Sequence, residues 1–163
     1  MVRHNPYILV TYAPGATLMK FILPLLSSLL LCLSAALAAD ISDGNGPPDL
    51  ESAKTLIAKK DWHSAVTNLE KFVKANPNNA DGFNLLGFSL RNLKRYPEAI
   101  FNYKEALRID PDHRGAHEYL GQTYVQTKQL DKAKELLASL EKICGVQCEE
   151  YLDLKKAIEK AKK

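Results

Sequence analysis

Apolar residues in the second half of the chain recur every three or four positions, the spacing that places them on one face of an α-helix. One such stretch has its apolar positions at Leu85, Leu86, Leu90 and Leu93. A second stretch follows after a short polar turn, with apolar positions at Ala99, Ile100, Tyr103, Ala106 and Leu107. Pro97 suits the first turn of this second helix, and Asp110-Pro111 ends it because the residue before a proline avoids helical backbone angles. The pattern predicts a helical hairpin.

This hairpin pattern returns with a fixed period of 34 residues. Small residues recur at Ala65, Ala99 and Ala133, and at Ala53, Gly87 and Gly121. Large apolar residues recur at Trp62, Tyr96 and Leu130, and at Leu69, Tyr103 and Leu137. A repeat of this length indicates stacked helical units. We predict an all-α solenoid over residues 49–161, with units at about 46–79, 80–113 and 114–145 and a C-terminal capping helix at about 148–161.

The repeated positions resemble those of the tetratricopeptide repeat family. The matching residues are Leu86, Gly87, Leu90, Tyr96, Ala99, Tyr103, Ala106 and Pro111, while Phe83 stands where the family usually has tryptophan. The resemblance covers residues 46 to about 143. It implies a right-handed solenoid in which the first helix of each unit lines a concave groove that binds other proteins.

The resemblance also implies which side chains line that groove. They are Asn84, Phe88, Arg91, Glu118, Gln122 and Val125, with Lys54 and Ile57 from the first unit. Phe88 beside Arg91 has the composition of a binding hot spot, and the alternative is that Phe88 packs against a helix of the next unit. One well-known branch of the family clamps C-terminal carboxylates with lysine and asparagine. Asn84 is compatible with that clamp, but residues such as Phe88 and Glu118 replace its other members, so we expect a mixed groove for a short peptide or a helix.

The N-terminal residues have the composition of a secretory signal. Met19-Lys20 precedes an apolar run from Phe21 to Leu37, and small residues at its end predict cleavage after Ala38. Residues 1–18 are interpreted as an extension upstream of a start at Met19, and residues 39–48 as a flexible linker. A periplasmic or secreted protein is therefore expected. The alternative is a retained inner-membrane anchor, with membrane contact through this segment alone.

Two cysteines, Cys144 and Cys148, remain after the predicted cleavage. In an exported protein such a pair around a tight turn favours a disulfide, here one that holds the last helix, whose apolar positions are Leu152, Leu154, Ala157 and Ile158. A thiol-active pair or free thiols are the alternatives. Two cysteines supply too few ligands for structural zinc.

The net charge and the remaining polar residues argue against several classes of function. The whole chain has a formal net charge of +3, and loss of Arg3 and Lys20 lowers it to about +1, which does not favour nucleic acid as partner. His113 and His117 are interpreted as a turn cap and an ordinary helix residue rather than a metal pair. No Ser-His-Asp order or glycine-rich phosphate loop is present. We predict a non-enzymatic scaffold or assembly factor without cofactor or metal, which could also form a homodimer.

Overall fold

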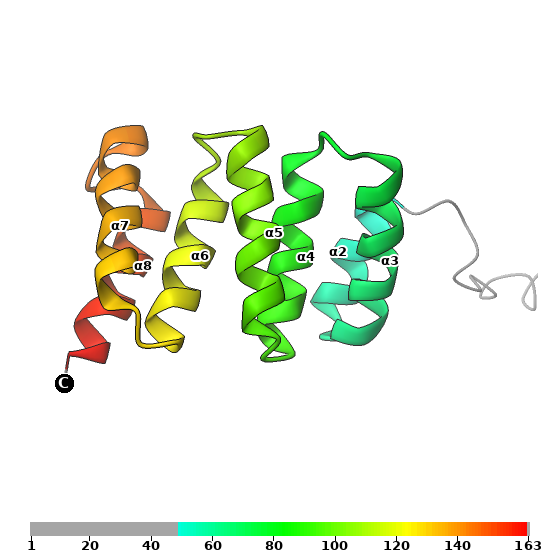
Figure 1. Cartoon of the computed structure of the whole chain (residues 1–163), viewed down its shortest axis with the longest axis horizontal. Helices are drawn as coiled ribbons and strands as arrows, with labels where there is room; N and C mark the ends of the chain where they lie inside the picture. The colour runs from blue at the N-terminus through cyan, green and yellow to red at the C-terminus, as the bar shows by residue number, and fades with distance from the viewer. Residues whose placement is uncertain (1–48, 163) are drawn as a thin grey trace, which may run out of the picture. The chain divides into compact units, whose positions relative to one another are not determined.

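The computed structural model describes residues 49–162, which form seven α-helices (Figure 1). The predicted signal segment and the predicted linker, residues 39–48, both lie outside these residues. The helices are α2 (Leu50–Ala58), α3 (Trp62–Ala75), α4 (Ala80–Asn92), α5 (Tyr96–Ile109), α6 (Arg114–Gln126), α7 (Leu130–Cys144) and α8 (Glu149–Ala161).

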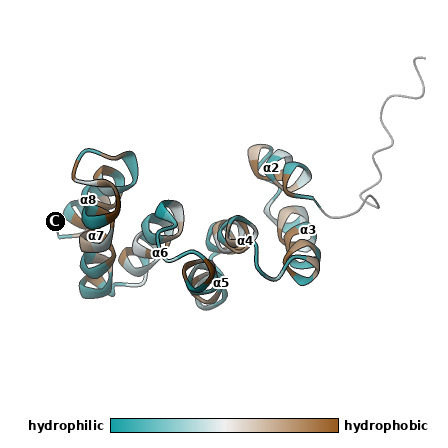
Figure 2. Ribbon diagram, turned by 90° about the horizontal axis from the view of Figure 1, so that it is seen from above, coloured by the Kyte–Doolittle hydropathy of each residue, from teal (hydrophilic) through white to brown (hydrophobic). Residues whose placement is uncertain are grey.

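The helices stack as hairpins, with each helix packed against the next one along the chain. Helices α2, α4, α6 and α8 lie on one side of the stack, and α3, α5 and α7 lie on the other (Figure 2). In this view α2 and α8 lie nearer the upper edge than α4 and α6, so the stack is curved, and we call the inner side of the curve the concave surface. The predicted all-α solenoid is confirmed. Among residues 49–162, none of the helices has the length and apolar character that a membrane span requires.

Side-chain caps fix where four of the helices begin. Asp49 accepts a hydrogen bond from the Ser52 backbone N–H at 2.7 Å, and Asp61 accepts one from Ser64 at 3.2 Å. Asn79 caps α4 through the Gly82 N–H at 2.8 Å. These bonds satisfy backbone donors that have no partner inside the helix. The residues before α2, α3, α4 and α6 therefore encode these four starts locally.

The turn inside each hairpin has the same backbone conformation. Lys60, Lys94 and Lys128 have positive φ angles of 58°, 61° and 60°. In each turn the lysine N–H and the next N–H bond back to carbonyls of the helix that ends there, for example Lys94 to Arg91 at 2.9 Å. This pattern is a helix C-cap with a left-handed residue. The 34-residue period is thus present in the backbone as well as in the side chains.

Close contact between helices explains the small residues of the repeat. A Cβ atom added at Gly87 of α4 would lie 2.8 Å from the ring of Tyr103, which is fully buried on α5. One added at Gly121 of α6 would lie 2.5 Å from Leu154 of α8. Carbon atoms at such distances clash, so any larger residue would push these helices apart.

Candidate interaction surface

Three aromatic side chains form a row that runs from the start of α3 across α4 to α6. The Phe88 ring of α4 lies 5.9 Å from that of Trp62, which begins α3, and 5.1 Å from that of Tyr119 on α6. All three residues are half-buried. Phe88 therefore packs against both neighbouring units while part of its side chain stays accessible. Packing between units and exposure for binding, the two alternatives for this residue, are thus compatible. We call Trp62, Phe88 and Tyr119 the aromatic row.

Arg91 lies over this row and is held from several sides. Its guanidinium carbon is 5.4 Å from the centre of the Phe88 ring and 5.5 Å from that of Tyr119, which are cation–π distances. Its Nη1 donates to Oε1 of Gln122 at 2.7 Å, and Nε2 of Gln122 donates to Oε1 of Glu118 at 2.7 Å. The chain of bonds from Arg91 to Glu118 joins α4 to α6 and holds the arginine in place.

Glu118 is a carboxyl group with only 7% of its surface exposed. Burial, which disfavours the ionised form, raises its pKa to about 7, and the charges of Asp153 and Glu150 on α8 add to the rise. Arg91 acts in the opposite direction. Glu118 is therefore partly protonated near neutral pH.

Asn84 is also more buried than a groove-lining residue is expected to be. It is 7% exposed, and its Oδ1 has no hydrogen-bond partner in the described part of the chain. Its Nδ2 would lie 3.4 Å from a Cβ atom added at Gly115, so the start of α6 covers this side chain. Val125 and Ile57 are half-buried against the hydrophobic core, while Lys54 is exposed and lies 3.7 Å from Glu51.

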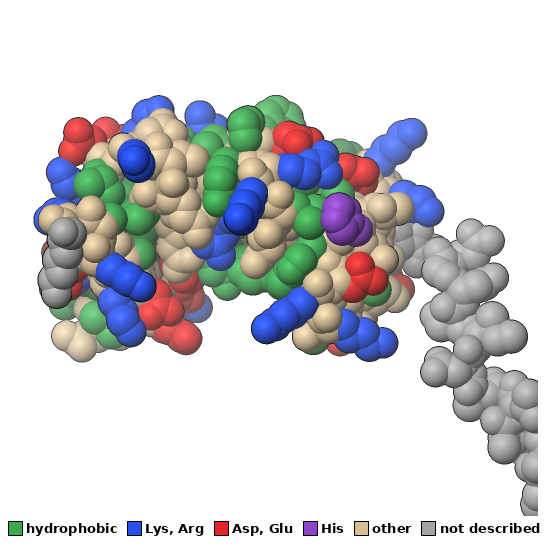
Figure 3. All heavy atoms as spheres, turned by 90° about the horizontal axis from the view of Figure 1, so that it is seen from below, with side chains coloured by type: hydrophobic (Ala, Val, Ile, Leu, Met, Phe, Trp, Pro, Cys, Tyr) green, Lys and Arg blue, Asp and Glu red, His purple; other side chains and the backbone are tan. Residues whose placement is uncertain are grey.

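The structure therefore unites Phe88, Arg91, Gln122 and Glu118 among the predicted groove residues. The sequence analysis did not assign Trp62 or Tyr119 to the groove. Tyr119 could have been found, because it follows Glu118 on a helix predicted to face the groove. The space-filling view shows a hollow at the lower edge of the molecule, with hydrophobic side chains inside it (Figure 3).

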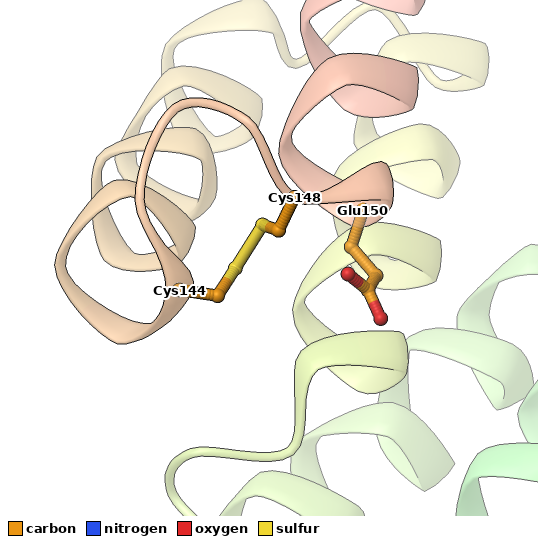
Figure 4. Close-up of side chains that lie close together, drawn as sticks. All are labelled: Cys144, Cys148 and Glu150. Atoms are coloured by element: carbon orange, nitrogen blue, oxygen red, sulfur yellow. A yellow bond between two sulfur atoms is a disulfide. The ribbon is translucent and has the colours of Figure 1, made fainter.

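The two cysteines connect the last two helices. The Sγ atoms of Cys144, at the end of α7, and Cys148, just before α8, lie 2.07 Å apart, the spacing of a disulfide bond (Figure 4). Between them Gly145 has a positive φ of 80°, which stops α7. Glu150 lies beside the pair, but its Oε1 is also 3.5 Å from Nε of Arg114. Sulfur atoms that bond to each other are not free to ligate a metal.

Both histidines that follow Pro111 bond to the backbone. Nδ1 of His113 accepts from the Ala116 N–H at 3.1 Å and so caps α6, while its Nε2 lies 3.0 Å from the carboxylate of Asp81. Nε2 of His117 lies 2.8 Å from the carbonyl oxygen of Pro111. These bonds hold the turn between α5 and α6.

Two family models described as tetratricopeptide repeat match the chain, over residues 50–112 and 90–158. The chain belongs to the tetratricopeptide repeat family. The repeats account for the paired helices and for the recurrence of small residues where the helices touch.

The proteins with similar sequence are much longer than this chain. Protein O-mannosyl-transferase TMTC3 of Mus musculus is 37% identical over 86 residues, which are 53% of this chain and 9% of that protein. Heat shock protein STI1 of Saccharomyces cerevisiae is 35% identical over 75 residues, which are 46% of this chain and 13% of that protein. Among solved structures, the TPR2B-domain:pHsp70-complex of yeast Sti1 has a TM-score of 0.61 at 23% identity and covers 68% of this chain and 90% of that chain. That likeness is one of fold.

Proposed function

We propose that this chain is a non-enzymatic module that binds a peptide or a helix of another protein on its concave surface. The aromatic row with Arg91 above it is the observation that carries the proposal. Aromatic residues and arginine dominate the binding energy of protein interfaces, and stacked repeats present extended concave surfaces to their partners.

The contacts of these residues suit them to binding. Phe88 supplies an apolar anchor, because its ring is flanked by two others and part of it stays accessible. Arg91 and Gln122 are ordered before a ligand arrives, since they bond to each other at 2.7 Å. Side chains that are already ordered lose less conformational entropy on binding. Glu118 and Asn84, which are mostly buried, support this surface from behind and contribute less direct contact.

The solved relative supports a polypeptide as the ligand class. The TPR2B domain of yeast Sti1 is described as a complex with pHsp70. A partner for this chain would bind without covalent chemistry or a cofactor.

The proposed site of action is outside the cytoplasm. The apolar run from residue 21 to residue 37 followed by small residues supports export with cleavage after Ala38. If this run is retained, the same module is anchored in a membrane as a structural element of the cell envelope. N-terminal sequencing of the exported protein decides between the two, because a start at Ala39 removes the anchor.

A crosslinking pull-down with paired variants tests the binding function. The Phe88→Ala, Arg91→Ala variant removes the aromatic and cationic groups of the concave surface. The Phe101→Ala, Arg108→Ala variant removes the same residue types from α5 on the opposite side, where the Phe101 side chain is 62% exposed. We expect a partner that the wild type captures to be lost with the first variant and kept with the second, both having unchanged helicity. Equal capture by both variants would show that the concave surface is not the binding site.

A further inference from the structure

Acidic side chains gather at the C-terminal end of the concave surface. Glu118 of α6 faces Glu149, Glu150 and Asp153 of α8, and the two helices touch at Gly121 and Leu154. We call these four residues the acidic end. Figure 3 shows acidic side chains beside the hollow on the side of the C-terminal helices, with basic ones farther out. The lysines of α8 begin at Lys155, beyond the acidic end.

The positive charges that face the acidic end do not balance it. Arg114 lies 3.5 Å from Glu150, and Arg91 is occupied by two aromatic rings and by Gln122. The remaining acidic groups repel one another. Burial is the main cause of the raised pKa of Glu118 and of Tyr119, and the negative charges of the neighbouring acidic groups raise both further. A cation placed here would relieve this repulsion, whereas an anion would add to it.

Apolar surface lies directly beside this charge. Tyr119 of the aromatic row follows Glu118 on α6, and the charges of Glu149 and Glu150 of α8 also act on its hydroxyl group. A ligand that covers both features needs an apolar group and a basic group close together.

We propose that the natural ligand of the concave surface is a basic, amphipathic segment of a partner protein. An aliphatic or aromatic side chain of this segment packs on the aromatic row, and lysine or arginine side chains lie against the acidic end. The inference rests on the proposed function and adds the chemical class of the partner. It also predicts that acidic peptides are poor ligands, because the acidic end repels them.

Fluorescence anisotropy with two synthetic probes tests this class. One probe is an amphipathic peptide of leucine and lysine, and the other has glutamate in place of every lysine. The full chain is compared with Asp153→Lys at the acidic end and with Glu135→Lys on α7, an exposed position on the opposite side with the same change of charge. A general effect of charge would change the probe affinity of both variants equally. A local effect would change the probe affinity of Asp153→Lys alone.

We expect the lysine probe to bind the wild type and the glutamate probe to bind it at least about fivefold more weakly. Asp153→Lys should weaken binding of the lysine probe by about fivefold and strengthen binding of the glutamate probe. Glu135→Lys should leave both affinities within about twofold of the wild-type values. Equal affinity of the two probes, no binding of either, or equal effects of the two variants would overturn the proposal.

Phe88→Ala separates this inference from the binding function itself. If that variant loses the captured partner while the two probes bind the wild type equally, the concave surface is the binding site and the basic class is wrong. If Phe88→Ala changes neither the capture nor the probe affinities, the proposed function fails as well, and the inference fails with it.

Discussion

The contribution of Glu118 to the stability of the folded protein depends on pH. In an unfolded chain this carboxyl group would ionise near pH 4.5, but in the folded protein it ionises near 7, because it is buried and faces other acidic side chains. Between these two pH values the folded state holds more protons than the unfolded state. The contribution of Glu118 to stability is therefore complete below the lower value and is lost as the pH rises through the upper one.

Replacement of Glu118 by glutamine should remove this dependence. The amide oxygen can still accept the hydrogen bond from Nε2 of Gln122, so the packing is retained without the titrating proton. We expect the free energy of unfolding of the wild type to fall more steeply than that of Glu118→Gln as the pH rises from 4.5 to about 7. Urea unfolding at a series of pH values measures this. Parallel curves for the two proteins would contradict the assignment.

For single residues, the sequence predicted which side chains lie on the surface but not which side chains they contact. Phe88 and Arg91 could be found because their helix faces follow from the repeat. The contact of Phe88 with Trp62 and Tyr119 could not, since it depends on how three different units stack. The burial of Glu118 was missed for the same reason, because its helix packs against α8, which begins 31 residues later in the sequence.

Helix α8 shows how much of one element its own residues determine. Leu154 is fully buried and Ile158 is 3% exposed, whereas Leu152 is 45% exposed although it belongs to the same apolar pattern. The sequence predicted this helix from that pattern and from Gly145 before it. Which apolar residues face inward depends on the angle at which α8 meets α6, and one helical sequence does not contain that angle.

Packing should hold α8 in place more strongly than the cysteine pair does. Leu154→Ala should lower the free energy of unfolding by about 3 kcal/mol, because it leaves a cavity against Gly121. The Cys144→Ser, Cys148→Ser variant should lower it by about 2 kcal/mol or less, since so short a ring constrains the unfolded chain little. Denaturant unfolding under non-reducing conditions compares them. The opposite order would mean that the covalent link is the main attachment of α8.

The whole array is built from contacts between neighbouring units, so its stability should vary along its length. Helix α2 has one buried residue, Ala53, and among the described helices it packs against α3 and α4 alone. Helix α4 has six buried residues and packs against α2, α3, α5 and α6. The ends of such an array lack a neighbour on one side, and they open more readily than its middle.

Hydrogen exchange followed by mass spectrometry should show this gradient. Backbone amides of α2 are expected to exchange fastest among the helices, and those of α4 and α5 slowest, because opening the middle breaks contacts on both sides. Peptides from all seven described helices can be compared in one experiment. Uniform protection from α2 to α8 would indicate that the array opens as a single unit.

The backbone conformation of the three hairpin turns affects the thermal stability of the array. Lys60, Lys94 and Lys128 each hold a left-handed backbone, which costs an ordinary residue about 1 kcal/mol and glycine or asparagine less. The three turns lie one repeat apart, so their costs should add. Asparagine at all three would raise the melting temperature by several degrees. The thermal limit of this protein is thus adjustable at three exposed positions, none of which belongs to the aromatic row or to the acidic end.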